Sequence, residues 1–248
     1  MLKRFRIENI NSVHNLIVQG CKLSEDENGV HVDETLFNQM VGCLMYLTAT
    51  RPYLMFVVSL ISRYMAKPTE LHLMAAKRVL RYLKGTIGLG VLYKKGGCEG
   101  LVAYADSNYA GDIEDKKSTS GYAFMLGSGA VAWSSRKQPI VTLSTTEAEF
   151  VAAAVCASQA IWMKRIIEKL SLEDSKCTII FCDNSSTIKL SKNPVLHGRS
   201  KHIDVRFHFL RDLTREGAIE LVYCGTQDQL ADVMTKPLTV DAFQRFRS

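Results

Sequence analysis

The spacing of hydrophobic positions in the first third of the chain is that of α-helices. Between residues 36 and 86, apolar side chains recur every three or four positions, as at Leu36, Met40 and Leu44. This period places them along one face of a helix. Three successive helices are expected, the last of them at 69–85, where a glycine follows a basic residue. The pattern therefore predicts a small helical bundle.

After residue 88 the apolar positions form short runs that are typical of β-strands, separated by glycine-rich turns and by further helical segments. Strands that alternate with helices in this way are typical of an α/β domain built around one mixed sheet. The expected elements are, in order, strands at 88–93, 101–105, 121–126 and 130–134, a helix at 144–170, a strand at 177–182, helices at 185–190 and 203–215, a strand at 218–224 and a short helix at 227–235.

The change of period predicts two main parts, with a boundary near the Gly96-Gly97 pair. The expected organisation is an irregular lead-in at 1–35, a helical segment at 36–95, an α/β domain at 96–240 and a C-terminal tail at 241–248.

Composition narrows the class of protein without identifying it. The chain has 248 residues, of which 47% are hydrophobic and 23% are charged, as in globular proteins with a substantial core. A net charge of +6 is compatible with an anionic partner but is also common in proteins that bind nothing acidic. Disorder is not indicated.

Cysteine usage and hydropathy indicate an intracellular location, cytoplasmic or nuclear. The seven cysteines are an odd number and form no CxxC pair, so neither a disulfide framework nor a zinc site is expected. The N-terminal MLKRFRIENI lacks the apolar core of a signal peptide, and the most apolar run, at 54–62, is too short to span a bilayer. No membrane partner is expected.

The stretch STTEAEFVAAA (144–154) contains two glutamates two positions apart. Ser144 and Glu147 have the spacing of a capping box at a helix start. Glu149 lies on a different face, because successive helical residues step by about 100°, and it shares that face with small apolar residues such as Ala153. A carboxylate there either reaches solvent at the helix end or belongs to a metal site, since burial without a partner is costly.

Three aspartates lie at the ends of other predicted elements. Asp106 follows a strand, Asp183 follows another, and Asp232 lies in the last short helix. Taken singly, each has an ordinary explanation, namely a turn, a helix N-cap and a solvated helix position. In α/β sheets, however, functional groups collect at strand ends. If these aspartates and Glu149 converge, a cluster of carboxylates suits Mg²⁺ or Mn²⁺ rather than zinc.

Several motifs resemble the ribonuclease H domain of copia-type LTR retrotransposon Pol polyproteins. The resemblance covers about 36–240, and its upstream part is similar to the segment that follows the reverse transcriptase palm. The domain motifs are YADSNYAGD (104–112), KKSTSGYAF (116–124), WSSRKQPIVTLSTTEAEFVAA (133–153), CDNSSTIKL (182–190), RSKHIDVRFHFLRD (199–212) and DQLADVMTKPL (228–238). The upstream motifs are MVGCLMYLTATRP (40–52) and PTELHLMAAKRVLRYLKGT (68–86).

The resemblance implies an α/β ribonuclease H-like fold, with a mixed five-stranded sheet flanked by helices and preceded by a polymerase thumb-like helical segment. It implies an endonuclease that hydrolyses the RNA strand of an RNA–DNA hybrid, using two Mg²⁺ ions for which Mn²⁺ can substitute. The family's catalytic, metal-binding carboxylates correspond to Asp106, Glu149, Asp183 and Asp232. Glu147 is left with the helix cap.

The chain departs from the wider pattern at two points. Many ribonucleases H have a histidine in the loop before the last aspartate, but CGTQDQLAD (224–232) has none. His202 and His208 are assigned no catalytic role, and Asp112 and Asp228 at most support the site. No YVDD-like turn of a polymerase precedes residue 36, so the chain is expected to be a truncated polyprotein fragment without polymerase activity.

Basic residues are the candidates for binding the hybrid, through its backbone shape and 2′-hydroxyls rather than its base sequence. On the helix at 69–85 they share one face, which is equally well explained as a solvated surface. The other candidates lie beside the predicted carboxylate site. The candidates are Lys77, Arg81, Lys84, Arg136, Lys137, Arg199, Lys201 and Arg206. No protein partner is indicated.

Two further functions compete with catalysis. The chain could be a non-catalytic nucleic-acid-binding relic that keeps the ribonuclease H fold. The four intact carboxylates favour catalysis, although a recent relic would keep them too. An effector that acts on a host protein has no supporting sequence feature.

Overall fold

The computed structural model describes residues 1–94, 100–170, 177–192 and 204–247. The predicted boundary at Gly96-Gly97 lies outside these ranges. The chain forms two compact units, and each consists of more than one chain segment. Unit 1 comprises Met1–Val91, Asp112–Asp115 and Lys236–Ser248, and unit 2 comprises Leu92–Gly111 and Lys116–Thr235.

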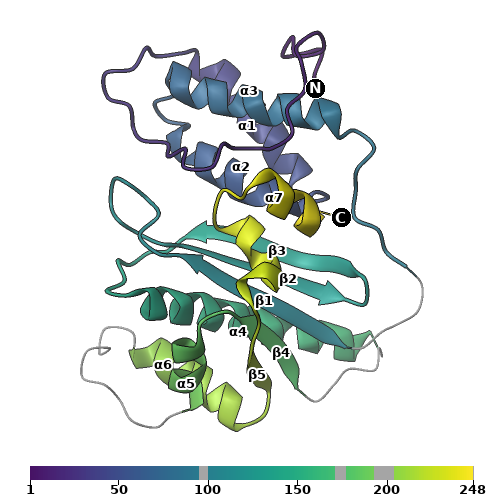
Figure 1. Cartoon of the computed structure of the whole chain (residues 1–248), viewed down its shortest axis with the longest axis vertical. Coiled ribbons are helices and arrows are strands. Elements are labelled where there is room, and N and C mark those ends of the chain that lie inside the picture. Colours follow the sequence, from purple (N-terminus) through teal and green to yellow (C-terminus); the bar gives the residue numbers. More distant parts are fainter. Residues whose placement is uncertain (95–99, 171–176, 193–203, 248) are drawn as a thin grey trace. The chain divides into compact units, whose positions relative to one another are not determined.

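Unit 1 contains the three helices that the apolar period predicts (Figure 1). They are α1 (Glu34–Leu47), α2 (Met55–Ile61) and α3 (Glu70–Gly85), with 3₁₀ turns η1 (Pro52–Leu54) and η2 (Ser62–Tyr64) before and after α2. Asp33 caps α1, because its side chain accepts hydrogen bonds from the amides of Thr35 and Leu36. The apolar faces of the helices pack together and bury Phe37, Leu44 and other large side chains.

A fourth helix of unit 1, α7 (Val240–Arg247), was not anticipated from the sequence. It packs through Phe243 against two tyrosines of the same unit, with ring centroids 6.1 Å from Tyr53 and 5.6 Å from Tyr82. Arg247 donates a hydrogen bond of 2.8 Å to the Tyr82 hydroxyl. The chain therefore returns to unit 1 after completing unit 2.

Unit 2 is built on one mixed five-stranded sheet in the order β3-β2-β1-β4-β5. Strands β1, β2 and β3 are antiparallel neighbours, whereas β4 runs parallel to β1 and β5 runs parallel to β4. The predicted α/β fold with a mixed five-stranded sheet flanked by helices is confirmed. The strands are β1 (Leu101–Asn108), β2 (Thr119–Leu126), β3 (Gly129–Lys137), β4 (Thr178–Cys182) and β5 (Ile219–Tyr223).

The long helix α4 (Thr145–Lys169) lies along one face of this sheet, with α5 (Ser185–Lys192) and α6 (Asp204–Arg215) beside it (Figure 1). Its contact stripe is made of small residues such as Ala153, Cys156 and Ala160, which are fully buried in the same core as alternate residues of β1. Small side chains let helix and sheet approach closely.

Helix α4 resembles a membrane-spanning helix in length and composition. Among the described helices, α4 alone is long and apolar enough to cross a bilayer, but half of its most apolar part is buried inside unit 2. This burial is that of a central helix in a folded domain.

The predicted strand at 88–93 is wrong. These residues form no strand, because the ladder partners of β1 are β2 and β4 and the outer strand β3 pairs with β2 alone. Tyr93 instead reaches the β2–β3 hairpin through its side chain, with its hydroxyl donating to the Ala130 carbonyl at 2.7 Å. An apolar run with two glycines was mistaken for a strand.

Candidate metal centre

Two of the four predicted carboxylates are positioned by neighbouring parallel strands. Asp106 lies near the end of β1, and Asp183 directly follows β4. The register pairs Tyr104 with Phe181, so the two aspartates lie at the same level two residues further on. Parallel strands end at the same edge of a sheet, which is where reactive groups converge in α/β folds.

The structure brings all four carboxylates together. Oxygen atoms of Asp106, Asp183 and Asp232 lie within 4.8 Å of one another, and Asp183 also belongs to a second group of the same compactness with Glu149 and the Cys182 sulfur. Asp106, Asp232 and Glu149 are 1%, 3% and 7% exposed. Carboxylates this close and this buried repel one another strongly unless a cation compensates their charge.

The donor set decides which cation fits. Four carboxylates supply oxygen ligands, which hard cations such as Mg²⁺ and Mn²⁺ prefer. No histidine occurs in either group of candidate ligands among the described residues. The residues therefore fit a hard divalent cation, and Asp183 is the residue common to both groups.

Asp232 is held by a 3₁₀ helix, η5 (Leu230–Met234), and its burial excludes the solvated position considered from the sequence. Gln229 begins this helix and accepts a hydrogen bond from the Ala231 amide. The Gln229 Nε2 atom donates to the Ala105 carbonyl at 3.0 Å. The segment with Asp232 is thus attached to β1 next to Asp106.

Thr235 makes a second connection between the same two segments. Its side chain is completely buried, and its hydroxyl donates to Asp106 Oδ2. The same hydroxyl lies 3.2 Å from the Asp232 carbonyl oxygen. Thr235 therefore holds one oxygen of Asp106 in place and so sets the orientation of the carboxylate.

Gly121 allows η5 to approach the sheet. It pairs with Asp106 across the β1–β2 ladder, and a Cβ atom at this position would lie 2.6 Å from Met234 Cβ and 2.7 Å from Thr235 Cγ2. Only glycine leaves room for this contact. Neither Gly121 nor Thr235 was recognised from the sequence.

The two glutamates of α4 have different hydrogen-bond partners. The Glu147 amide donates to the hydroxyl of the N-cap residue Ser144 at 3.2 Å, and the Glu147 carboxylate accepts from the Leu143 amide at 2.7 Å. Glu149 instead turns to the sheet, where its Oε1 accepts from the Ser107 amide at 3.1 Å. The opening of α4 thus places one glutamate in the cap and the other in the cluster.

Helix capping does not account for Asp183. Asn184 Oδ1 accepts a hydrogen bond of 3.0 Å from the Thr187 amide, so Asn184 caps α5. The Asp183 carboxylate is half-buried and accepts a hydrogen bond of 3.3 Å from the Thr226 hydroxyl. Of the two explanations that the sequence left open, the structure supports the cluster.

Gln138 is a further residue that the sequence did not single out. It follows β3 and is almost completely buried. Its Nε2 atom lies 2.8 Å from Ser120 Oγ, 3.0 Å from the Ala148 carbonyl oxygen and 3.3 Å from Ser107 Oγ. It therefore joins β1, β2 and the first turn of α4 through Ser107 and Ala148, which are next in sequence to Asp106 and Glu149.

The negative charge of the cluster affects a neighbouring thiol. Burial, followed by the charges of Asp183, Asp228, Asp232 and Asp106, raises the pKa of Cys224 to about 11. The six cysteines in the described ranges are free thiols.

The predicted nucleic-acid-binding residues are dispersed. Arg136 and Lys137 end β3, and Arg206 lies on α6. Arg199 and Lys201 lie outside the described residues, as does His202.

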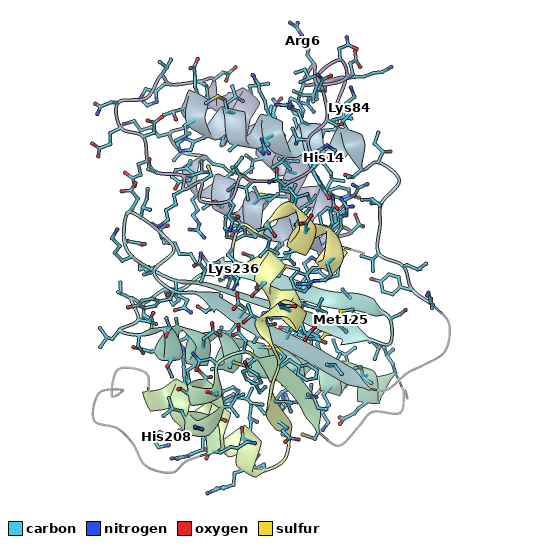
Figure 2. All side chains as sticks on the ribbon, viewed as in Figure 1. Arg6, His14, Lys84, Met125, His208 and Lys236 are labelled. Atoms are coloured by element: carbon cyan, nitrogen blue, oxygen red, sulfur yellow. The ribbon has the colours of Figure 1, made fainter. Side chains whose placement is uncertain are left out.

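On α3, Lys77 is exposed, whereas two other cations of the predicted basic face bind the lead-in. Arg81 Nε donates to the Asn11 carbonyl at 2.8 Å, and Lys84 Nζ donates to the Ile10 carbonyl at 3.0 Å. Figure 2 shows Lys84 at this helix, as well as His208 on α6. His208 is exposed and lies 2.7 Å from an Arg211 nitrogen.

The two further aspartates lie outside both groups of candidate ligands. Asp112 belongs to unit 1, where it forms an ion pair of 2.9 Å with Arg63. It also accepts hydrogen bonds from the amides of Glu114 and Asp115. Asp228 is exposed on the turn before η5.

Comparisons with known proteins give relatives over most of the chain. The retrovirus-related Pol polyprotein from transposon RE1 of Arabidopsis thaliana is 44% identical over 216 residues, which are 87% of this chain and 15% of that protein. The corresponding polyprotein from transposon TNT 1-94 of Nicotiana tabacum is 36% identical over 98% of this chain and 19% of that protein. The chain therefore spans less than a fifth of these polyproteins. No protein-family model matches.

Two other similarities are more limited. The secreted RxLR effector protein 161 of Plasmopara viticola is 44% identical over 124 residues, which are 50% of this chain and 87% of that protein. Among solved structures, LC11-RNase H1 in complex with an RNA/DNA hybrid is 13% identical, with a TM-score of 0.42 over 60% of this chain and 99% of that chain.

Proposed function

Because the chain belongs to the family of copia-type retrotransposon Pol polyproteins, we propose that it is a ribonuclease H-type endonuclease that hydrolyses the RNA strand of RNA–DNA hybrids. The convergence of Asp106, Glu149, Asp183 and Asp232 supports this proposal. Four acids from segments distant in sequence meet at one sheet end, and the local explanations for Asp183 and Asp232 do not account for their positions.

These four carboxylates would hold two Mg²⁺ ions, or Mn²⁺ in their place, which activate a water molecule and stabilise the departing 3′ oxygen of a phosphodiester when bound. The surrounding residues orient the carboxylates in advance. The Ser107 amide fixes one oxygen of Glu149, and the Thr235 hydroxyl fixes one oxygen of Asp106. Ligands held in this way need little rearrangement during the reaction, which is how positioning contributes to rate.

The competing proposal is a relic that binds nucleic acid without cutting it. Intact carboxylates alone do not distinguish a recent relic from an enzyme, but cleavage does. The likeness to the effector protein concerns half of the chain and does not explain why four acids converge. We expect no polymerase activity, since the 248 residues contain no pair of adjacent aspartates.

The test is cleavage of an end-labelled RNA–DNA hybrid in Mg²⁺ and in Mn²⁺. Wild type is expected to cut the RNA strand, and Asp183→Asn, which removes a ligand charge but keeps the shape, is expected to be inactive. Glu149→Gln and Glu147→Gln form a matched pair two residues apart, of which only the first should lose activity. If the wild type leaves the hybrid uncut but binds it, the relic proposal replaces the enzyme.

A further inference from the structure

Four cations gather at the sheet end that carries the carboxylates. Lys116 and Lys117 lead into β2, and Arg136 and Lys137 end β3. We refer to these four residues as the cationic strip. The antiparallel register pairs Thr119 with Lys137 and Ser120 with Arg136, so the start of β2 and the end of β3 lie side by side. Figure 1 shows β1 and β3 ending at this same end of the sheet.

The register also gives the separation between the strip and the cluster. Thr119 pairs with Asn108 on β1, two residues beyond Asp106. With about 3.4 Å per residue along a strand and about 4.8 Å between strands, the Lys137 backbone lies roughly 12 Å from that of Asp106. At about 3.4 Å per nucleotide step along a duplex axis, this is three to four steps. The strip therefore lies within a few nucleotide steps of the cluster.

The side chains of the strip face both sides of the sheet end. Asp106 pairs with Gly121, which pairs with Ser135, so these three positions point to the same face of the sheet. Lys137 lies two residues after Ser135 and therefore points to that face too. Arg136 has the opposite parity and therefore projects from the other face. Lys116 and Arg136 are exposed. The strip thus borders the cluster as a rim instead of covering it.

The loop before β2 separates its acidic residues from its lysines. In the sequence DIEDKK (112–117), Asp112 pairs with Arg63, and Glu114 accepts a hydrogen bond of 3.0 Å from the Glu25 amide. The acidic residues of this loop belong to unit 1, whereas the lysines belong to unit 2. Two of the three acidic residues of this loop, Asp112 and Glu114, therefore have partners within unit 1.

Lys116 also has an unusual backbone. Its φ of 55° is in the left-handed region, which costs a residue with a Cβ atom about 1–2 kcal/mol. A strained position that persists in a loop next to a candidate site is an indication of function. The turn fixes the point at which the two lysines leave the loop for β2.

We propose that the cationic strip binds phosphates of the hybrid three to four nucleotides from the cleavage point and supplies affinity that does not depend on base sequence. This inference rests on the proposed function for its ligand. It adds Lys116 and Lys117 to the residues that bind the hybrid, and it groups them with Arg136 and Lys137 at the same end of the sheet.

The test measures hybrid affinity separately from cleavage. Binding of a fluorescently labelled RNA–DNA hybrid is followed in Ca²⁺, with gels confirming that the hybrid stays intact, over a range of salt concentrations. Two double variants, Lys116→Gln with Lys117→Gln and Arg136→Gln with Lys137→Gln, each remove two charges. The matched control is Arg165→Gln with Lys169→Gln, which removes two exposed charges from the other end of α4, about 24–30 Å along the helix from Glu149.

Each lost phosphate contact lowers the slope of log affinity against log salt by about 0.9. We expect a slope reduced by one to two, and a dissociation constant raised about tenfold to sixtyfold near 0.1 M salt, for each strip variant. The control should bind like wild type, and the unfolding temperature of every variant is measured to separate a lost phosphate contact from a lost fold.

Wild-type slope and affinity in both strip variants would overturn the proposal, as would an equal loss in the control or a wild type that does not bind hybrid. Failure of this inference can be told apart from failure of the nuclease proposal. A chain that binds through the strip but never cuts keeps this inference and loses the enzyme. If the wild type cuts the hybrid while the strip variants bind it normally, the nuclease proposal stands and this inference is lost.

Discussion

Replacement of Gly121 by alanine tests whether the close contact between η5 and the sheet assembles the site. The new Cβ atom would lie 2.6 Å from Met234 Cβ and 2.7 Å from Thr235 Cγ2, and 3.2 Å from the Met234 backbone carbon. Because Met234 Cβ is bonded directly to the backbone, rotation of a side chain cannot relieve this overlap. The segment must retreat by about 0.4 Å to reach 3.0 Å and by about 0.8 Å to reach an ordinary contact of 3.4 Å.

This retreat would move two of the four carboxylates apart. Asp232 lies within η5, and Thr235 holds Asp106 from the residue after it. A misplacement approaching 1 Å can reduce a rate by about a hundredfold, so Gly121→Ala should lower the cleavage rate by roughly tenfold to a hundredfold. Overpacking of this kind also destabilises by about 1–3 kcal/mol.

The assay combines single-turnover cleavage of the hybrid with urea unfolding. Gly42→Ala is the matched control, because a Cβ atom at this position of α1 meets nothing within 4 Å. Alanine there should leave cleavage unchanged and stabilise the helix by about 0.5–1 kcal/mol. Wild-type cleavage together with wild-type stability in Gly121→Ala would refute the reasoning.

Three further predictions concern single groups around the site. Thr235→Val should destabilise the chain by about 1–3 kcal/mol in urea unfolding, because the buried Asp106 carboxylate loses a donor, whereas Thr235→Ser should not; equal stabilities would contradict the role of the hydroxyl. Asn184→Ala should cost about 1 kcal/mol by removing the α5 cap while cleavage persists, and an inactive but fully stable variant would show a different role. Folding raises the pKa of Cys224 from 9.0 to about 11, so between these values the folded chain keeps a proton that the unfolded chain releases. The free energy of unfolding should therefore fall as pH rises through this window. Cys224→Ser should show a smaller fall, and a pH profile identical to that of wild type would count against the shift.

Local patterns predicted most of the elements because their causes are local. The apolar period and the caps define α1, α3 and α4 without reference to distant residues. The segment at 88–93 was misread because a strand requires a ladder partner, which the pattern of a single segment does not contain. Helix α7 was missed because a helix of 8 residues depends on tertiary packing, here against Tyr53 and Tyr82.

The candidate site was predictable only where its residues stand in a recognisable local pattern. The carboxylates stood out through their place at element ends and through the family motifs. Gly121 and Thr235 did not, because their roles depend on contacts between segments more than 100 residues apart. Gln138 looked like an ordinary polar residue after a strand, and only the folded chain places its amide among Ser107, Ser120 and Ala148.

The measurement that tests the central claim most directly is the number of Mn²⁺ ions bound by the chain in the presence of the hybrid, counted from the free Mn²⁺ signal in electron paramagnetic resonance. The wild type should bind two ions, and Asp183→Asn should lose binding because Asp183 belongs to both groups of ligands. Equal Mn²⁺ binding by wild type and Asp183→Asn would contradict the claim that these carboxylates form a metal centre.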